Sequence, residues 1–208
     1  AYPAEDVLNN YDYSLKKAKE LLKEAGWEDR DGDGIIENNE NEDFIVKLKY
    51  PTGNKIREKI APIVQASLKQ IGIKVNLARM EFSTLMDQVV GNHEFELYLM
   101  GNNLGLDPDP KPYWHSMAAS DKKGVYAWNI SSFKNKKADK LMEKGLSTLD
   151  LNKRKAVYKK FAKLMNKELP WVYLFCQNKR IAYNPNLKNF NPTTHLNFLN
   201  VEDWVIYK

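Results

Sequence analysis

Residues 44–77, FIVKLKYPTGNKIREKIAPIVQASLKQIGIKVNL, decide the fold of this 208-residue chain. Apolar side chains at every second position of residues 44–50 predict a strand. Apolar residues at helical spacing follow over residues 54–71, where Pro62 is expected to bend the helix, and residues 73–77 predict a second strand. This order forms a βαβ unit whose two strands run parallel. The predicted class is α/β, with a mixed sheet flanked by helices.

Further elements are predicted on both sides of this unit. Residues 14–26 carry one apolar stripe at helical spacing, with Ser14 able to cap the helix and Gly26 able to end it. A helix at residues 83–90 and a strand at residues 94–100 continue the alternation. The sheet is therefore expected to have at least one more strand.

The second half of the chain is less regular. A stretch dense in Gly, Pro, Asn and Asp occupies residues 101–116, which predicts a long loop of the kind that carries functional sites. Helices are predicted at residues 135–147 and 151–167, and short strands at residues 171–176 and 180–183. No internal repeat divides the chain, so a single lobe is expected.

The composition excludes several classes of protein. Hydrophobic residues make up 43% of the chain and aromatic residues 12%, too much for a disordered protein. The apolar runs are far shorter than the roughly 18 residues that a membrane span needs. The 32 Lys and Arg only slightly exceed the 27 Asp and Glu and are spread out, so no nucleic acid partner is expected. The single cysteine, Cys176, excludes a disulfide framework.

Residues 29–40, DRDGDGIIENNE, match the spacing of a calcium-binding loop. Gly34 falls at the sixth position, where such a loop turns sharply. A predicted strand follows the loop where an EF-hand has its second helix, so a pair of EF-hands is not expected. A structural Ca²⁺, a calcium sensor and an Asp/Gly-rich turn without a cation all stay open. The candidate ligands are Asp29, Asp31, Asp33, Ile35 through its carbonyl, Glu37 and Glu40.

Catalytic motifs are missing from the sequence. It contains no G-x-S-x-G, H-E-x-x-H, Walker or G-x-G-x-x-G pattern. The three histidines, His93, His115 and His195, are far apart and are expected to be surface or hydrogen-bonded residues. Cys176 lies in the apolar run WVYLFC and is predicted to be an inert core thiol. The chain is therefore not expected to be an enzyme; the alternative is a small hydrolase that uses His115 or Cys176.

Aromatic residues gather in and after the long loop. Such amphipathic rings can form the wall of a ligand cleft, or they can pack in a core beneath the loops. Both interpretations stay open from the sequence. The residues concerned are Tyr113, Trp114, Tyr126 and Trp128.

Five segments, in this order, resemble the C-terminal lobe of the extracellular solute-binding proteins of peptide-type ABC importers, family 5. Each is a weak signal alone, but their common order is specific. They are YDYSLKKAKELLKEAGW (11–27), DRDGDGI (29–35), IVQASLKQIGIKVNL (63–77), FELYLMGNNLGLDPDP (95–110), and Arg154 and Tyr158 followed by Glu168, Leu169 and Pro170.

The resemblance implies a periplasmic-binding-protein-like type II fold. Residues 1–208 would form one C-terminal lobe whose N-terminal partner lobe is absent, and residues 195–208 would run toward that lobe. A protein of this family captures oligopeptides between two lobes and delivers them to permease subunits in the membrane. The resemblance further implies a monomer outside the cytoplasm, either periplasmic or a cell-surface lipoprotein; the first residues do not resemble a signal peptide.

The family's cleft segment corresponds to residues 101–109. In members that bind a free peptide amino terminus, an Asp follows a Gly-Trp pair; here Asn102 replaces the Trp, and Asp107 is the nearest Asp. The ligand class therefore stays open, with an oligosaccharide, a nickel complex or haem on the same scaffold, or a calcium-binding module, as alternatives. The implied ligand-binding residues are Gly101, Asn102, Asn103, Leu104 and Asp107, to which Trp114 is added as an aromatic wall.

Overall fold

The computed structural model describes residues 6, 8–102, 107, 109–120, 122–178, 180–193 and 196–207. The chain divides into two compact units. The first comprises Ala1–Asn102 and Pro110–Pro170, and the second comprises Asn103–Asp109 and Trp171–Lys208. Among the described residues, no helix is long and apolar enough to cross a membrane.

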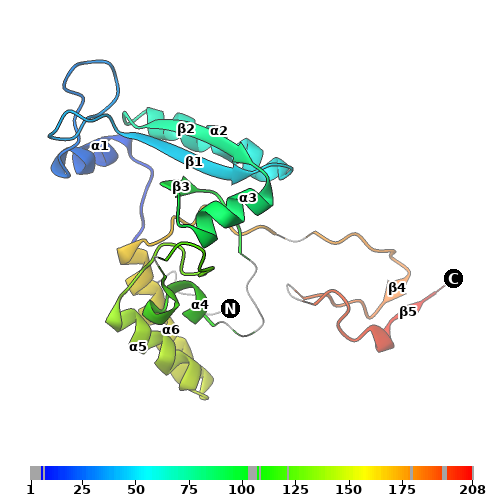
Figure 1. Ribbon diagram of the computed structural model, residues 1–208. Helices are drawn as coiled ribbons and strands as arrows, with labels where there is room; N and C mark the ends of the chain where they lie inside the picture. Colours follow the sequence, from blue (N-terminus) through cyan, green and yellow to red (C-terminus); the bar gives the residue numbers. More distant parts are fainter. Residues whose placement is uncertain are drawn as a thin grey trace. The chain divides into compact units, whose positions relative to one another are not determined.

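A parallel sheet forms the centre of the first unit (Figure 1). Strand β1 (Ile45–Pro51) pairs with β2 (Lys74–Met80) from Ile45 opposite Lys74 to Pro51 opposite Met80. Helix α2 (Lys55–Lys69) connects the two strands, and the short β3 (Leu97–Tyr98) pairs in parallel with the other side of β1. The predicted βαβ unit and the α/β class are thus confirmed. Helix α2 remains continuous through Pro62.

Helix α1 (Leu15–Glu24) precedes the sheet and has the predicted ends. The Ser14 hydroxyl accepts the Lys17 N–H, which satisfies one of the donors that a helix start leaves free. Gly26 follows with φ +89°, a conformation that glycine adopts without strain. Trp27 then stacks against Phe44 with the ring centroids 4.3 Å apart, and both rings pack on the sheet core.

The predicted strand at residues 94–100 forms only at Leu97–Tyr98. Side chains form hydrogen bonds with backbone groups that a longer pair of strands would use. The Lys49 ammonium donates to the Glu94 carbonyl, and the Glu96 carboxylate accepts the Lys47 N–H at 2.6 Å. The preceding helix begins as α3 (Phe82–Met86) and continues as a π-helical turn, Asp87–Gly91.

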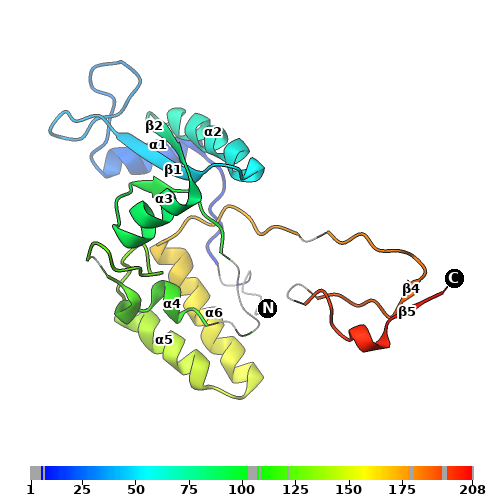
Figure 2. The same cartoon turned by 45° about the vertical axis from the view of Figure 1, so that its right-hand side comes forward.

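The later part of the first unit contains further helices, joined by loops. The short α4 (Lys111–Trp114) precedes α5 (Lys136–Ser147) and α6 (Leu151–Glu168), which lie side by side (Figure 2). These two long helices match the sequence prediction. Their shared core consists of Ala138, Met142, Tyr158, Phe161 and Met165.

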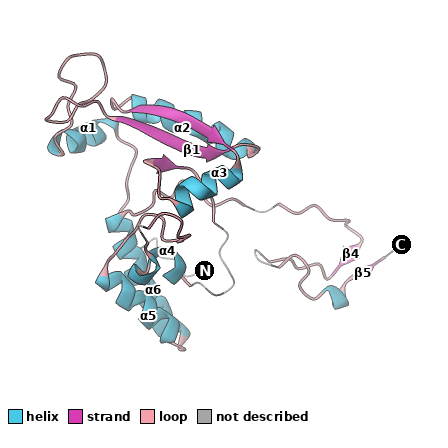
Figure 3. Ribbon diagram, viewed as in Figure 1, coloured by secondary structure: helices cyan, strands magenta, loops and turns pink. Residues whose placement is uncertain are grey.

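The predicted strands at residues 171–176 and 180–183 are wrong (Figure 3). A strand needs a partner edge, and in the described part of the second unit only β4 (Leu187–Lys188) and β5 (Val205–Ile206) pair. The predicted core position of Cys176 is also wrong, because this thiol is exposed. The apolar run WVYLFC predicted burial, but its side chains are largely exposed to solvent; Val172, for example, is 79% exposed.

Candidate functional site

The carboxyl ends of the three parallel strands meet at one edge of the sheet. Ligands of α/β proteins bind preferentially at such an edge. Thr52 follows β1 directly, and Gly101 comes three residues after β3. The predicted cleft segment thus begins beside the first turn of α2, which carries Arg57.

Arg57 is the residue at this edge that sequence reasoning missed. Its guanidinium Nη2 lies 3.0 Å from the position that a Cβ on Gly101 would occupy. Partial burial lowers the pKa of Arg57 from its ordinary value, because charge is less favourable away from water. Among the described residues, no carboxylate forms an ion pair with Arg57. The available signal was its position in the first turn of the helix that follows a strand.

The neighbouring polar groups are already bonded to one another. The Arg79 Nε lies 3.5 Å from Glu58 Oε1, and Arg79 Nη2 donates to Thr52 Oγ1 at 2.7 Å. Glu58 Oε1 also accepts the Gly53 N–H at 2.9 Å. Among the described residues, the Arg57 guanidinium donates no hydrogen bond, so its N–H groups are available to another acceptor. A guanidinium suits a carboxylate or carbonyl oxygen, the groups that a peptide presents.

The predicted ligand-binding residues belong to two different units. Gly101 and Asn102 are exposed residues of the first unit, whereas Asp107 is an exposed residue of the second. Asn103 and Leu104 lie outside the described residues. Trp114 packs against Phe161 with a centroid distance of 6.1 Å, as in the core-packing interpretation, whereas Tyr126 and Trp128 are exposed. Their roles in ligand binding stay predictions.

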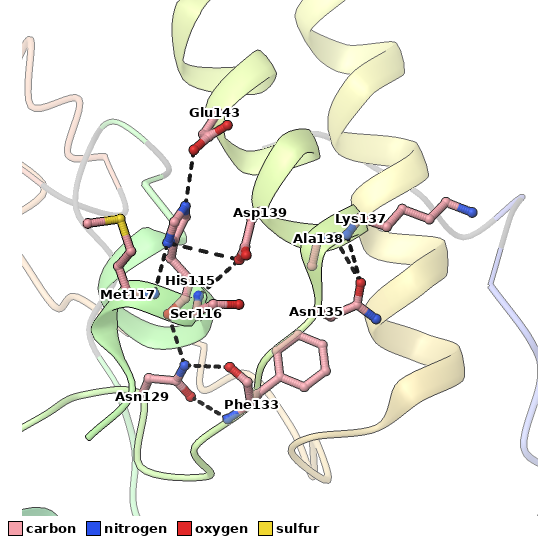
Figure 4. A network of polar contacts seen from close by, with 10 residues as sticks. All are labelled: His115, Ser116, Met117, Asn129, Phe133, Asn135, Lys137, Ala138, Asp139 and Glu143. Carbon is pink, nitrogen blue, oxygen red and sulfur yellow. Dashed lines mark hydrogen bonds and ion pairs between the residues drawn. The ribbon is translucent and has the colours of Figure 1, made fainter. Parts of the chain in front are cut away.

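A polar network surrounds His115, which is 7% exposed (Figure 4). Its Nδ1 accepts the Met117 N–H at 3.2 Å, which assigns the proton to Nε2, 3.3 Å from Glu143 Oε1. Asp139 accepts the Ser116 N–H at 2.9 Å. The histidine therefore fastens its loop to α5, in line with the expected hydrogen-bonded role. An open hollow of about 380 Å³ lies beside it, lined by Lys111, Pro112, His115, Met117, Ala118 and Glu143.

The Asp/Gly loop brings four of its predicted metal ligands together. One carboxylate oxygen from each of four residues lies within 4.8 Å of the others. The group consists of Asp29, Asp31, Asp33 and Glu37. Glu40 is exposed and outside this group, and Ile35 is partly buried between Gly34 and the core residue Ile36.

Comparison with known proteins identifies relatives along the whole chain. The family model "Bacterial extracellular solute-binding proteins, family 5 Middle" matches residues 1–125. The oligopeptide-binding protein AppA of Bacillus subtilis is 35% identical over 209 residues, which cover 100% of this chain and 37% of that protein. The di/tripeptide-binding protein 2 of Pseudomonas aeruginosa is 28% identical over 171 residues, covering 82% of this chain and 30% of that protein.

Solved structures agree with these matches. AppA from Bacillus subtilis in complex with a nonapeptide has a TM-score of 0.82 and 33% identity, covering 100% of this chain and 40% of that chain. This confirms the periplasmic-binding-protein-like fold expected from the sequence. The chain spans well under half the length of each of these relatives. It belongs to the bacterial extracellular solute-binding proteins of family 5.

Proposed function

We propose that this chain is part of the substrate-binding component of an ABC importer, and that the complete protein captures oligopeptides. The observation that carries the proposal is the match of the whole chain to AppA of Bacillus subtilis, a protein solved with a nonapeptide. The family is one of solute-binding proteins, and the described geometry fits binding without covalent chemistry.

The sheet edge gives this proposal a physical basis. Extended peptides are held by hydrogen bonds to their backbone and by charged groups at their ends, which tolerates varied side chains. Arg57, which has no carboxylate partner among the described residues, offers a planar cation to a peptide carbonyl or carboxylate. Gly101 leaves this cation accessible because it has no side chain to cover it.

The remaining partners follow from the same proposal. A second, N-terminal lobe would close over the ligand by a hinge motion, as in other two-lobe binding proteins. The closed protein would then deliver the peptide to permease subunits in the membrane. It would act outside the cytoplasm as a monomer, either free in a periplasm or attached to the cell surface as a lipoprotein.

Native mass spectrometry of the full-length protein tests the proposal. The protein is purified without denaturation and incubated with a mixed peptide library, and parallel samples receive oligosaccharides, haem or a nickel–histidine complex. We expect a retained or captured peptide mass, which also gives the preferred length. A protein that ignores every peptide and takes up one of the other solutes would contradict the proposal.

A further inference from the structure

The loop between α1 and β1 has the geometry of a cation site. Ca²⁺ binds oxygen ligands at about 2.3–2.6 Å, so opposite ligands lie about 4.6–5.2 Å apart. One carboxylate oxygen from each of Asp29, Asp31, Asp33 and Glu37 lies within 4.8 Å of the other three. Four carboxylates therefore occupy the space of one coordination sphere.

Glu37 gives an independent indication of a ligand. Its side chain is only 4% exposed. One carboxylate oxygen, Oε2, accepts the Arg30 N–H at 2.8 Å, whereas the other, Oε1, is buried and has no hydrogen-bond partner among the described residues. A buried carboxylate oxygen without a partner is strongly unfavourable, so this oxygen requires a hydrogen-bond donor or a cation. The three other carboxylates gathered beside Glu37 favour a cation.

Arg30, the cation within the loop, is used elsewhere. Its Nη1 donates to the carbonyls of Glu37 at 2.6 Å and Asn38 at 2.8 Å, and its Nη2 donates to Asn39 Oδ1 at 3.0 Å. The guanidinium thus binds backbone and amide oxygens of the loop. Among the described residues it forms no ion pair with the four carboxylates, so it does not neutralise their charge.

Backbone hydrogen bonds hold Glu37 in place. Its N–H donates to the Glu28 carbonyl at 3.1 Å, and the Glu28 N–H donates back to Glu37 at 3.1 Å. The preceding residue, Ile36, is buried in the sheet core and donates its N–H to the Gly72 carbonyl at 2.9 Å. The ninth loop position is therefore fixed to the core.

The twelfth position of the loop differs from that of an EF-hand. In an EF-hand a second helix follows the loop, and the glutamate at position 12 is a bidentate ligand. Here Glu40 lies in an exposed turn, with its N–H bonded to Asn38 Oδ1 at 2.8 Å, and β1 follows the loop. Glu40 belongs to no group of carboxylates that the described residues bring together for a metal.

We propose that this loop binds one structural Ca²⁺ through Asp29, Asp31, Asp33 and Glu37, with the carboxylate of Glu37 replacing that of Glu40. The Ile35 carbonyl at the seventh position is the expected fifth ligand. The oxygen-only set favours Ca²⁺ over zinc, and the four carboxylates favour it over the smaller Mg²⁺, which keeps several waters and usually binds only one or two carboxylates. The ion joins the end of α1 to the start of the sheet.

Isothermal titration calorimetry on the chelator-treated full-length protein tests this site. We expect one Ca²⁺ per chain and a much weaker response to Mg²⁺. Glu37→Gln should weaken Ca²⁺ binding by at least about tenfold, whereas the matched change Glu40→Gln should alter it by less than about threefold. Ca²⁺ should also raise the Tm of the wild-type protein and of Glu40→Gln by similar amounts, and that of Glu37→Gln by clearly less.

Three results would overturn the proposal. They are the absence of both heat and a Tm shift at millimolar Ca²⁺, an equal affinity for Mg²⁺, and an equal loss of affinity in the two glutamate variants. If Glu37→Gln does not fold, Asp31→Asn at an exposed ligand replaces it, and unchanged affinity in that variant would contradict the site.

Discussion

The guanidinium of Arg57 lies so close to Gly101 that a methyl group on Gly101 would be 3.0 Å from Arg57 Nη2. This approach brings the first turn of α2 next to the segment that follows β3. It also places a partly buried cation at the sheet edge where the family resemblance implies the ligand cleft. The pair therefore gives the peptide-binding proposal a specific residue to test.

Arg57→Gln should weaken peptide binding by the full-length protein. A hydrogen bond to a charged group contributes about 1.5–3 kcal/mol, so we expect the Kd to rise by about ten- to 150-fold. Lys55→Gln is the matched control, because it removes one positive charge from an exposed side chain in the same helical turn. Equal affinities of the two variants, measured by titration with a captured peptide, would exclude Arg57 from the site.

Asp107→Ala should weaken peptide binding more than Asp29→Ala does. Asp107 belongs to the segment that the family resemblance assigns to the cleft, whereas Asp29 is a ligand of the proposed calcium loop. Asp29→Ala should therefore lower calcium affinity and leave peptide affinity nearly unchanged. Calorimetry with peptide and with Ca²⁺ separates the two effects, and equal peptide affinities would remove Asp107 from the binding site.

Local patterns predicted the elements that local interactions determine. The alternation in residues 44–50 and the helical spacing in residues 54–71 predicted the βαβ unit. The apolar face of a strand or helix can be recognised from the spacing of residues that are near in sequence. The spacing of Asp29, Asp31 and Asp33 likewise predicted the carboxylate group of the loop. The sequence could not show that Glu37 is buried while Glu40 is exposed, since that depends on packing against Gly72.

The strands that depend on distant residues were predicted too long or were predicted where none forms. Strand β3 is short because the side chains of Lys49 and Glu96 bond to backbone groups that a longer strand pair would use. Each of these bonds joins residues more than 40 positions apart in the sequence. The run at residues 171–176 has the composition of a strand, but pairing requires an edge that its own sequence does not supply. Arg57 became a candidate only through its proximity to Gly101, which comes much later in the chain.

Asn129→Ala should destabilise the chain by about 2–4 kcal/mol. Asn129 is 0% exposed and its amide donates to the carbonyls of Phe133 at 2.8 Å and His115 at 3.1 Å, while its Oδ1 accepts the Phe133 N–H at 3.0 Å. The substitution removes these three hydrogen bonds from buried and partly buried backbone groups. Asn135→Ala removes only the N-cap of α5 and should cost about 1 kcal/mol. Urea unfolding compares the two, and equal losses would contradict the role of Asn129.

Gly72→Ala tests the attachment of the Asp/Gly loop to the core. Gly72 has φ +84°, and a Cβ there would lie 2.6 Å from Ile36 Cγ2, so backbone strain and overpacking add. We expect a loss of about 2–4 kcal/mol in unfolding free energy. Gly53→Ala is the matched control, since Gly53 has φ +77° but nothing within 4 Å of a Cβ, and it should lose only about 1 kcal/mol.

The same pair of variants separates stability from metal binding. Because Ile36 precedes Glu37, displacing Ile36 also displaces the carboxylate that we assign to Ca²⁺. Gly72→Ala should therefore lower calcium affinity, whereas Gly53→Ala should not. Calorimetry at a temperature where both variants are folded gives this comparison. A Gly72→Ala protein with unchanged calcium affinity would show that the loop holds its ligands without support from the core.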